Sequence, residues 1–95
     1  PQVDQVFVLA RAVADVAVIP SPDEEAGEVP KACVVLRAAV NESELLGFVA
    51  ARVAPYRRIR LLEFVDALPR SASGKLLRRV LVERERSSSG AAVAD

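Results

Sequence analysis

The stretch VADVAVIPSPDEEAGEVPKACVVLR, residues 13–37, contains two apolar, β-branched runs separated by an acidic connection that is rich in proline. The runs at 13–19 and at about 31–37 have the composition of strands, because Val and Ile fit a pleated surface. Pro20 and Pro22 lack a backbone donor, so we expect the first strand to end at Pro20. Residues 23–30 then form an irregular connection. The pattern predicts two antiparallel strands whose loop is too long for a tight hairpin.

The segments outside this pair predict helices and one further strand. Asn41 or Ser43 can cap a helix start, and Glu44 stands three residues after Asn41 as in a capping box. Expected in chain order are a short helix beginning near Val3, a helix that starts near Asn41 and ends at Ala54-Pro55, a strand at about 59–66, and a helix from Lys75 to about Arg86. The fold class predicted is α+β: a small three-stranded sheet packed with about three helices in a single domain over 1–86. The tail 87–95 is small and polar, and we expect it to be disordered.

Length and composition limit the possible functions. A chain of 95 residues with 52% hydrophobic residues forms one small domain with a real core, but not a deep active site of its own. Cys33 is the single cysteine, which excludes an internal disulfide and predicts a buried structural thiol. The chain has no histidine and no cysteine cluster, so we predict no metal site. It shows neither a signal peptide nor a membrane span, and we expect a soluble, cytoplasmic domain.

Charge is distributed unevenly along the chain. Residues 1–51 carry three basic and eight acidic side chains, whereas residues 52–86 carry ten basic and four acidic ones. The basic half either faces an anionic partner or is an ordinary solvated surface. Nucleic acid is not a predicted partner, because aromatic stacking residues are few beyond Tyr56 and Phe64 and no nucleic-acid motif is present.

The loop RSASGK, residues 70–75, carries the residue best suited to chemistry. Ser71, Ser73 and Gly74 predict a flexible polar turn, and Lys75 places a compact positive charge at its end. Such a charge can reach a phosphate or a carboxylate. The loop does not match a phosphate-binding P-loop, because Pro69 replaces the first glycine and Leu76 replaces the hydroxyl residue. The alternative is a solvated lysine in the first turn of a helix, where a cation opposes the helix dipole.

Four motifs in order carry a family resemblance. They are Asp15 near the first strand, P-D-E-x-x-G-E-x-P-K-A (22–32), A-P-Y-[KR]-[KR] (54–58) and P-[KR]-S-x-S-G-K-[IL]-L-R-R (69–79). With them, about residues 3–83 resemble the C-terminal lid domain of adenylate-forming acyl-CoA synthetases, a superfamily that includes fatty-acyl-CoA, acetyl-CoA and coumarate–CoA ligases. One departure is Arg11-Ala12, where the family usually has His-Pro.

The resemblance implies a two-step ligase in which this domain is a mobile lid. A large N-terminal adenylation domain would bind ATP, Mg²⁺ and a carboxylic acid, and CoA would accept the acyl group in the second step. Lys75 would be the catalytic residue of the adenylation step, and Gly74 would belong to the substrate- or nucleotide-binding loop. The hinge and the Lys-Gly loop of the family would lie upstream of Pro1. We therefore expect a lid that is inactive without its large domain.

The alternative function is a non-catalytic interaction or regulatory module, in which a protein acetyltransferase modifies Lys75 and removes its charge. Other motif residues have structural readings at least as good as functional ones. These are Gly27 and Glu28 in the connection between strands, Tyr56, Arg57 and Arg58 near nucleotide or CoA phosphates, and Arg78 and Arg79 on the last helix.

Overall fold

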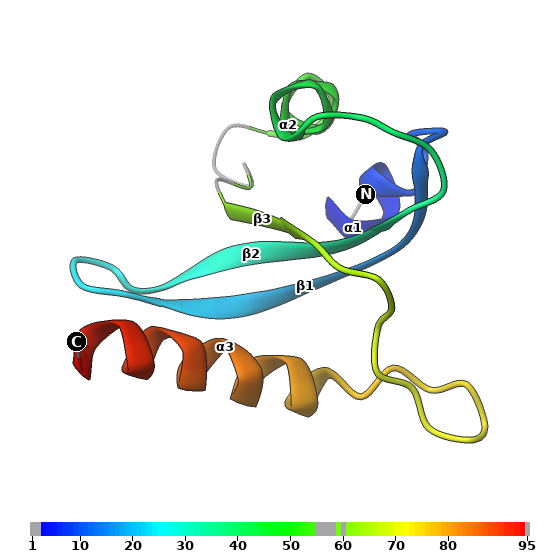
Figure 1. The fold of residues 1–95 in the computed structure, drawn as a ribbon. Helices are drawn as coiled ribbons and strands as arrows, with labels where there is room; N and C mark the ends of the chain where they lie inside the picture. Colours follow the sequence, from blue (N-terminus) through cyan, green and yellow to red (C-terminus); the bar gives the residue numbers. More distant parts are fainter. Residues whose placement is uncertain (1–2, 55–58, 60, 95) are drawn as a thin grey trace.

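Two long strands, β1 (Val13–Asp23) and β2 (Gly27–Leu36), form an antiparallel hairpin across the middle of the molecule (Figure 1). The computed structural model describes residues 3–54, 59 and 61–94. The antiparallel pairing predicted from the sequence is confirmed. Both strands are longer than predicted: β1 continues through Pro20 and Pro22, and β2 begins before Pro30.

The prolines are tolerated because of where they fall in the ladder. Pro20 lies opposite Pro30, and Pro22 lies two residues further along β1 opposite Glu28. Two prolines facing each other cannot exchange N–H···O bonds, so theirs is a non-hydrogen-bonded pair. Because the two types of pair alternate along the ladder, Pro22, two residues further on, also lies in a non-hydrogen-bonded pair. β1 is an edge strand, and β2 meets β3 only from Lys31 onward. The missing donors therefore interrupt no ladder bond, and the prediction that the strand ends at Pro20 is wrong.

The connection between the strands is a tight turn rather than the irregular loop predicted from the sequence. Asp23 pairs with Gly27, which leaves three residues between them. The Asp23 carboxylate accepts hydrogen bonds from the backbone N–H groups of Glu25 (3.2 Å) and Ala26 (2.9 Å). Gly27 has φ +81°, a left-handed conformation that favours glycine. Asp23 and Gly27 thus allow a hairpin that strand composition alone does not reveal.

The third strand, β3 (Leu61–Phe64), runs parallel to β2 and completes a mixed sheet in the order β1-β2-β3. It is shorter than the predicted strand at 59–66, although Val65 still donates its N–H to the Val34 carbonyl (2.9 Å). Parallel strands need a long crossover, and here α2 (Glu42–Ala50) supplies it. The predicted α+β class with a three-stranded sheet is confirmed.

The capping signal at Asn41 is confirmed at the start of α2. The Asn41 side chain accepts a hydrogen bond from the Glu44 N–H (2.7 Å) and donates one to the Glu44 carboxylate (2.8 Å). The helix ends at Ala50, earlier than the predicted end at Ala54-Pro55. Its last turn tightens, because Arg52 donates its N–H to the Val49 carbonyl three residues back. Pro55 lies outside the described residues.

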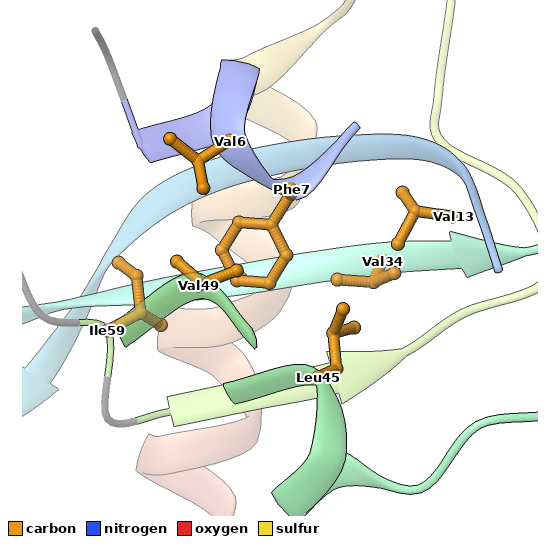
Figure 2. Packing of buried hydrophobic residues seen from close by; sticks show 8 residues of the cluster. Val6, Phe7, Val13, Val34, Leu45, Val49 and Ile59 are labelled. Atoms are coloured by element: carbon orange, nitrogen blue, oxygen red, sulfur yellow. The ribbon is translucent and has the colours of Figure 1, made fainter. Parts of the chain in front are cut away.

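The sheet divides the core into two clusters, one on each face. The first cluster packs α1 (Val3–Phe7) and α2 against one face, and its buried residues are Val6, Phe7, Val13, Ala32, Val34, Leu45, Val49 and Ile59 (Figure 2). Figure 2 shows the Phe7 ring between the two helices and the sheet. The second cluster packs α3 (Arg78–Ala94) against the opposite face, with buried residues Ala17, Ile19, Cys33, Leu68 and Leu81. Figure 1 shows α3 alone on that face.

The last helix differs from its prediction at both ends. α3 begins at Arg78 instead of Lys75. It continues to Ala94, beyond the predicted end near Arg86, and the disorder of the tail 87–95 stays a prediction. The three alanines of this segment have high helix propensity, whereas its serines and glycine have lower propensities. The domain boundary at 86 stays a prediction. Among the described residues, no helix is both long and apolar enough to cross a membrane.

A network of charges joins α3 to all three strands. Lys31 of β2 forms ion pairs with Glu85 of α3 (2.7 Å) and Glu63 of β3 (2.8 Å), and Ser21 of β1 donates a hydrogen bond to Glu85 (2.6 Å). The side chains of Lys31 and Glu85 are only 15% and 13% exposed. Burial raises the pKa of Glu85, but the hydrogen bonds donated by Lys31 and Ser21 outweigh it and hold that pKa below its ordinary value.

The pKa of Lys31 is set by a similar balance between burial and neighbouring charges. Burial lowers the pKa of Lys31, but the carboxylates of Glu63 and Glu85 outweigh it and raise that pKa. The network therefore favours the charged form of both partners. The network stabilises the folded state over the pH range in which Glu85 and Lys31 are both charged. Its contribution is lost when acid protonates Glu85 or alkali deprotonates Lys31.

We predict that Glu85→Gln lowers the free energy of unfolding at pH 7 by about 1–3 kcal/mol, because charge-assisted hydrogen bonds are lost. The folded-state pKa of Glu85 is depressed, so its contribution is present above the unfolded-state value of about 4.3 and is lost as the pH falls through the folded-state pKa. Urea unfolding at pH 7 and at pH 3 should show a smaller pH dependence in the variant. Glu83→Gln, on the exposed face of α3, is the control. An equal loss at both pH values would contradict the prediction.

Candidate functional site

The loop between β3 and α3 is a small hairpin anchored in the second core cluster. Arg70 and Leu76 form an antiparallel bridge, and Leu77 donates its N–H to the Pro69 carbonyl (2.9 Å). Leu68 is buried before the hairpin, and Leu76 packs against the same cluster after it. These contacts hold residues 75–77 in an extended form, which is why α3 begins only at Arg78. Both legs of the loop are thus fixed by apolar contacts with the core.

The tip of the hairpin is held by its own backbone and hydroxyl groups. Ser71 donates its N–H to the Lys75 carbonyl (2.9 Å), and Gly74 donates its N–H to the Ser71 carbonyl (2.9 Å). The Ser71 hydroxyl oxygen accepts a hydrogen bond from the Lys75 N–H (3.2 Å) and lies 3.0 Å from the Ser73 hydroxyl. Gly74 has φ +88°, a conformation that other residues adopt only with strain. The polar turn predicted from the sequence is therefore a hairpin turn closed by its own hydrogen bonds, and its flexibility stays a prediction.

Lys75 is exposed at the base of this turn, next to Gly74. Its backbone closes the hairpin, and its side chain forms no ion pair with a carboxylate in the described part of the chain. Because α3 starts three residues later, the predicted place in the first helical turn is wrong, and the argument from the helix dipole does not apply. The structure places an exposed cation on a loop whose two legs pack against the second core cluster. Such a cation can contact an anion supplied by another molecule or domain.

Arg70 joins this hairpin to the sheet. One guanidinium nitrogen lies 2.6 Å from a carboxylate oxygen of Asp15, and the other donates to the Gly74 carbonyl (3.0 Å). The other Asp15 oxygen accepts a hydrogen bond from the Val16 N–H (3.0 Å). Asp15 and Arg70 each occur in a motif noted in the sequence, but sequence reasoning missed their contact. They are 55 residues apart, and only the packing of the loop on β1 brings them together.

The remaining candidate residues take structural roles or lie outside the description. Arg78 donates a hydrogen bond to the Val18 carbonyl and so ties the start of α3 to β1. Arg79 pairs with Glu83 on the exposed face of the same helix. Gly27 serves the β1–β2 turn, and Glu28 lies 4.0 Å from Arg86. Tyr56, Arg57 and Arg58, for which a place near nucleotide or CoA phosphates was one interpretation, lie outside the described residues.

Three hollows of the described surface lie away from this loop. They have volumes of about 240, 260 and 350 Å³ and are lined by residues of the strands, of α3 and of the segment 65–67, without any residue from 69–75. One is bordered by Cys33, and burial raises the pKa of that thiol, which disfavours the reactive thiolate. The described residues contain no group of three or more potential metal ligands. The candidate site that the described residues offer is therefore the exposed cationic loop rather than one of these three hollows.

We predict opposite effects for two glycine substitutions. A Cβ at Gly74 or at Gly47 would meet no atom within 4 Å, so only the backbone differs between them. Gly74→Ala should lower the free energy of unfolding by about 1–2 kcal/mol, because φ +88° is strained for alanine. Gly47→Ala, within α2, should raise it by about 0.5–1 kcal/mol. Urea unfolding of both variants checks this, and a neutral Gly74→Ala would show that the turn does not require glycine.

Comparison with known proteins gives consistent matches. The family model "AMP-binding enzyme C-terminal domain" matches residues 2–75 and thus ends on Lys75. The 4-coumarate–CoA ligase-like 1 protein of Arabidopsis thaliana is 47% identical over 85 residues, which are 87% of this chain and 16% of that protein. The chain therefore spans about one sixth of the length of this relative.

Solved structures give the same match. A fatty acyl CoA synthetase of Mycobacterium tuberculosis aligns with a TM-score of 0.86 and 33% identity over 92% of this chain and 18% of that one. The o-succinylbenzoate CoA synthetase of Bacillus subtilis, in complex with the acyl-adenylate intermediate OSB-AMP, aligns with a TM-score of 0.78 and 38% identity. That alignment covers 84% of this chain and 16% of the synthetase chain.

Proposed function

The chain belongs to the AMP-binding enzyme C-terminal domain family, and we propose that it is the lid of an ATP-dependent acid–thiol ligase. The observation that carries this proposal is the exposed Lys75 on a hairpin whose two legs are anchored in the core. The lid acts with a large N-terminal adenylation domain of the same enzyme. On its own it is inactive, because the lysine is only one of the groups that the reaction requires.

The reaction proceeds in two steps. A carboxylate oxygen of the acid attacks the α-phosphorus of ATP, the bond to the β-phosphate oxygen breaks, and pyrophosphate leaves with an acyl-adenylate as the product. The thiol of CoA then attacks the acyl carbon, a proton is lost from sulfur, and AMP leaves. The acyl-adenylate complex of the Bacillus subtilis synthetase supports the proposed intermediate.

Lys75 serves the first step. Two anions, the carboxylate and the α-phosphate, must approach each other, and a positioned ammonium group offsets their repulsion. It also stabilises the negative charge that develops on the phosphate oxygens in the transition state. Lys75 is suited to this task because it offers one exposed cationic group at the end of its loop. Gly74 gives the turn its left-handed corner and leaves space beside the lysine for a nucleotide or substrate.

The large domain supplies the other requirements. We assign Mg²⁺ and most contacts with ATP to it, because Lys75 contributes charge but no carboxylate ligand for a cation. Selection of the carboxylic acid also belongs to that domain. The buried free thiol of Cys33 is compatible with a reducing compartment, and we place the ligase in the cytoplasm.

We predict that Lys75→Ala in the complete ligase lowers the rate of acyl-adenylate formation by about 10²–10³-fold, as for loss of one transition-state contact. Exchange of pyrophosphate into ATP measures this step. Thioester formation from supplied acyl-adenylate and CoA should keep its rate, because the lysine has no task in the second step. Equal damage to both steps, or to neither, would refute the role of Lys75.

A regulatory function is the second candidate, and the exposure of Lys75 favours it. The chain has two lysines, and they differ sharply: Lys31 is 15% exposed and held by two carboxylates, whereas Lys75 is exposed on its loop. An acetyltransferase acting on Lys75 would remove the charge that adenylation needs.

Incubation of the domain with a protein lysine acetyltransferase and acetyl-CoA should modify Lys75 and spare Lys31, which serves as an internal control. Mass spectrometry of peptides locates the acetyl group. Acetylation of Lys31 alone, or of neither lysine, would contradict this second function.

A further inference from the structure

The direction in which Lys75 points depends on a loop that lies outside the regular elements. Figure 1 shows this loop extending beyond the sheet at the start of α3. Leu68 and Leu76 anchor its legs, but they do not fix the orientation of the tip. The contact that does so is the two-pronged one from Arg70, which holds the Gly74 carbonyl with one nitrogen and the Asp15 carboxylate with the other. Gly74 is the residue directly before Lys75.

The acidic end of this contact is set by an irregularity in β1. The register between β1 and β2 shifts between Val13 and Asp15, which marks a β-bulge. In a regular strand, Val13 and Asp15 would point to the same face. The bulge lets Val13 enter the first core cluster while Asp15 lies at the parity of Ala17 and Ile19, on the face of α3 and the loop. The bulge therefore places the Asp15 carboxylate on the side of the sheet where Arg70 lies.

We propose that Asp15 and Arg70 are positioning residues for Lys75 in the adenylation step, an inference that rests on the function proposed above. The connection runs from the bulge through the Asp15 carboxylate and the Arg70 guanidinium to the Gly74 carbonyl, and from there to the adjoining lysine. Together these contacts hold the backbone of the lysine in one place relative to the sheet.

The exposure of the pair supports a positional rather than a stabilising role. The side chains of Arg70 and Asp15 are 40% and 33% exposed, and exposed ion pairs contribute little to the free energy of unfolding. Position is more sensitive, since a misplacement of about 1 Å can lower a catalytic rate by about 10²-fold. The planar guanidinium contacts two acceptors at once, which an ammonium group at the same place does not do with the same geometry.

The test measures both half-reactions in the complete ligase with Asp15→Asn, Arg70→Gln and Arg70→Lys. Each should lower kcat for acyl-adenylate formation by about 10–10²-fold, within the range for a misplaced catalytic group, and leave thioester formation from supplied acyl-adenylate unchanged. Arg70→Lys keeps the charge but loses the fork, so its rate should fall as well. The thermal unfolding midpoints should stay within a few degrees of the parent value.

A second arm separates positioning from a merely structural effect. If Asp15 and Arg70 act through the lysine, then Asp15→Asn added to Lys75→Ala should cause no further loss of adenylation rate. The matched control is a second exposed ion pair, Glu28 of β2 with Arg86 of α3, whose side chains are 56% and 67% exposed. Glu28→Gln and Arg86→Gln remove charges of the same kinds and should leave both half-reactions unchanged.

The outcomes are distinguishable. If Lys75→Ala disables adenylation but Asp15→Asn and Arg70→Gln do not, the positioning inference is overturned and the proposed function stands. If Lys75→Ala has no effect, the proposed function fails. In that case amide hydrogen exchange of the 95-residue chain still tests the contact: Asp15→Asn should speed exchange at Ser71 and Gly74, and unchanged exchange would overturn the contact itself.

Discussion

The antiparallel ladder between β1 and β2 is the constraint on which the rest of the structure depends. Because side chains alternate between the faces of a strand, this ladder determines which residues meet α1 and α2 and which meet α3. A shift of register by one residue would exchange the faces and expose both sets. The facing prolines Pro20 and Pro30 add to this specificity, since they are accommodated only where the ladder needs no donor from either.

The two faces of the sheet serve different purposes. The face covered by α1 and α2 contains the larger cluster, which includes the fully buried Phe7. The opposite face is smaller, and a polar network around Lys31 and Glu85 supplements its apolar contacts. Leu76 belongs to that second cluster and directly follows Lys75. The contacts that hold α3 on the sheet therefore also fix the base of the candidate functional loop.

Much of the architecture follows from local sequence signals. The two β-branched runs, the Asn41 cap and the lysine loop each rest on neighbouring residues, and the structure confirms the sheet, the capped helix and the place of the loop. Strand ends are harder to predict. A proline interrupts a strand only if its position in the ladder would require a donated N–H, which depends on the type of pair and on whether a neighbouring strand lies on that side. Neither is visible without the partner strand.

The start of α3 was missed for a related reason. The sequence after Gly74 is a good helix former, but the bridge between Arg70 and Leu76 keeps it extended up to Leu77. The same holds for the contact of Arg70 with Asp15, which requires both a bulge in β1 and a loop that returns to it after 55 residues. A single sequence indicates that these residues belong to motifs, but it does not show that they touch.

The groups that keep this domain folded are separate from those to which we assign its proposed function. Its stability resides in two buried clusters and a largely buried network, whereas the proposed catalytic charge and its positioning pair are exposed or half-exposed. The proposed function would benefit from this arrangement, because a cation that is to contact an anion bound by another domain cannot be buried in its own domain. The loop can lose its charge, by substitution or modification, with little cost to folding. Legs anchored in the core and an exposed tip are therefore the features that the proposed lid function requires.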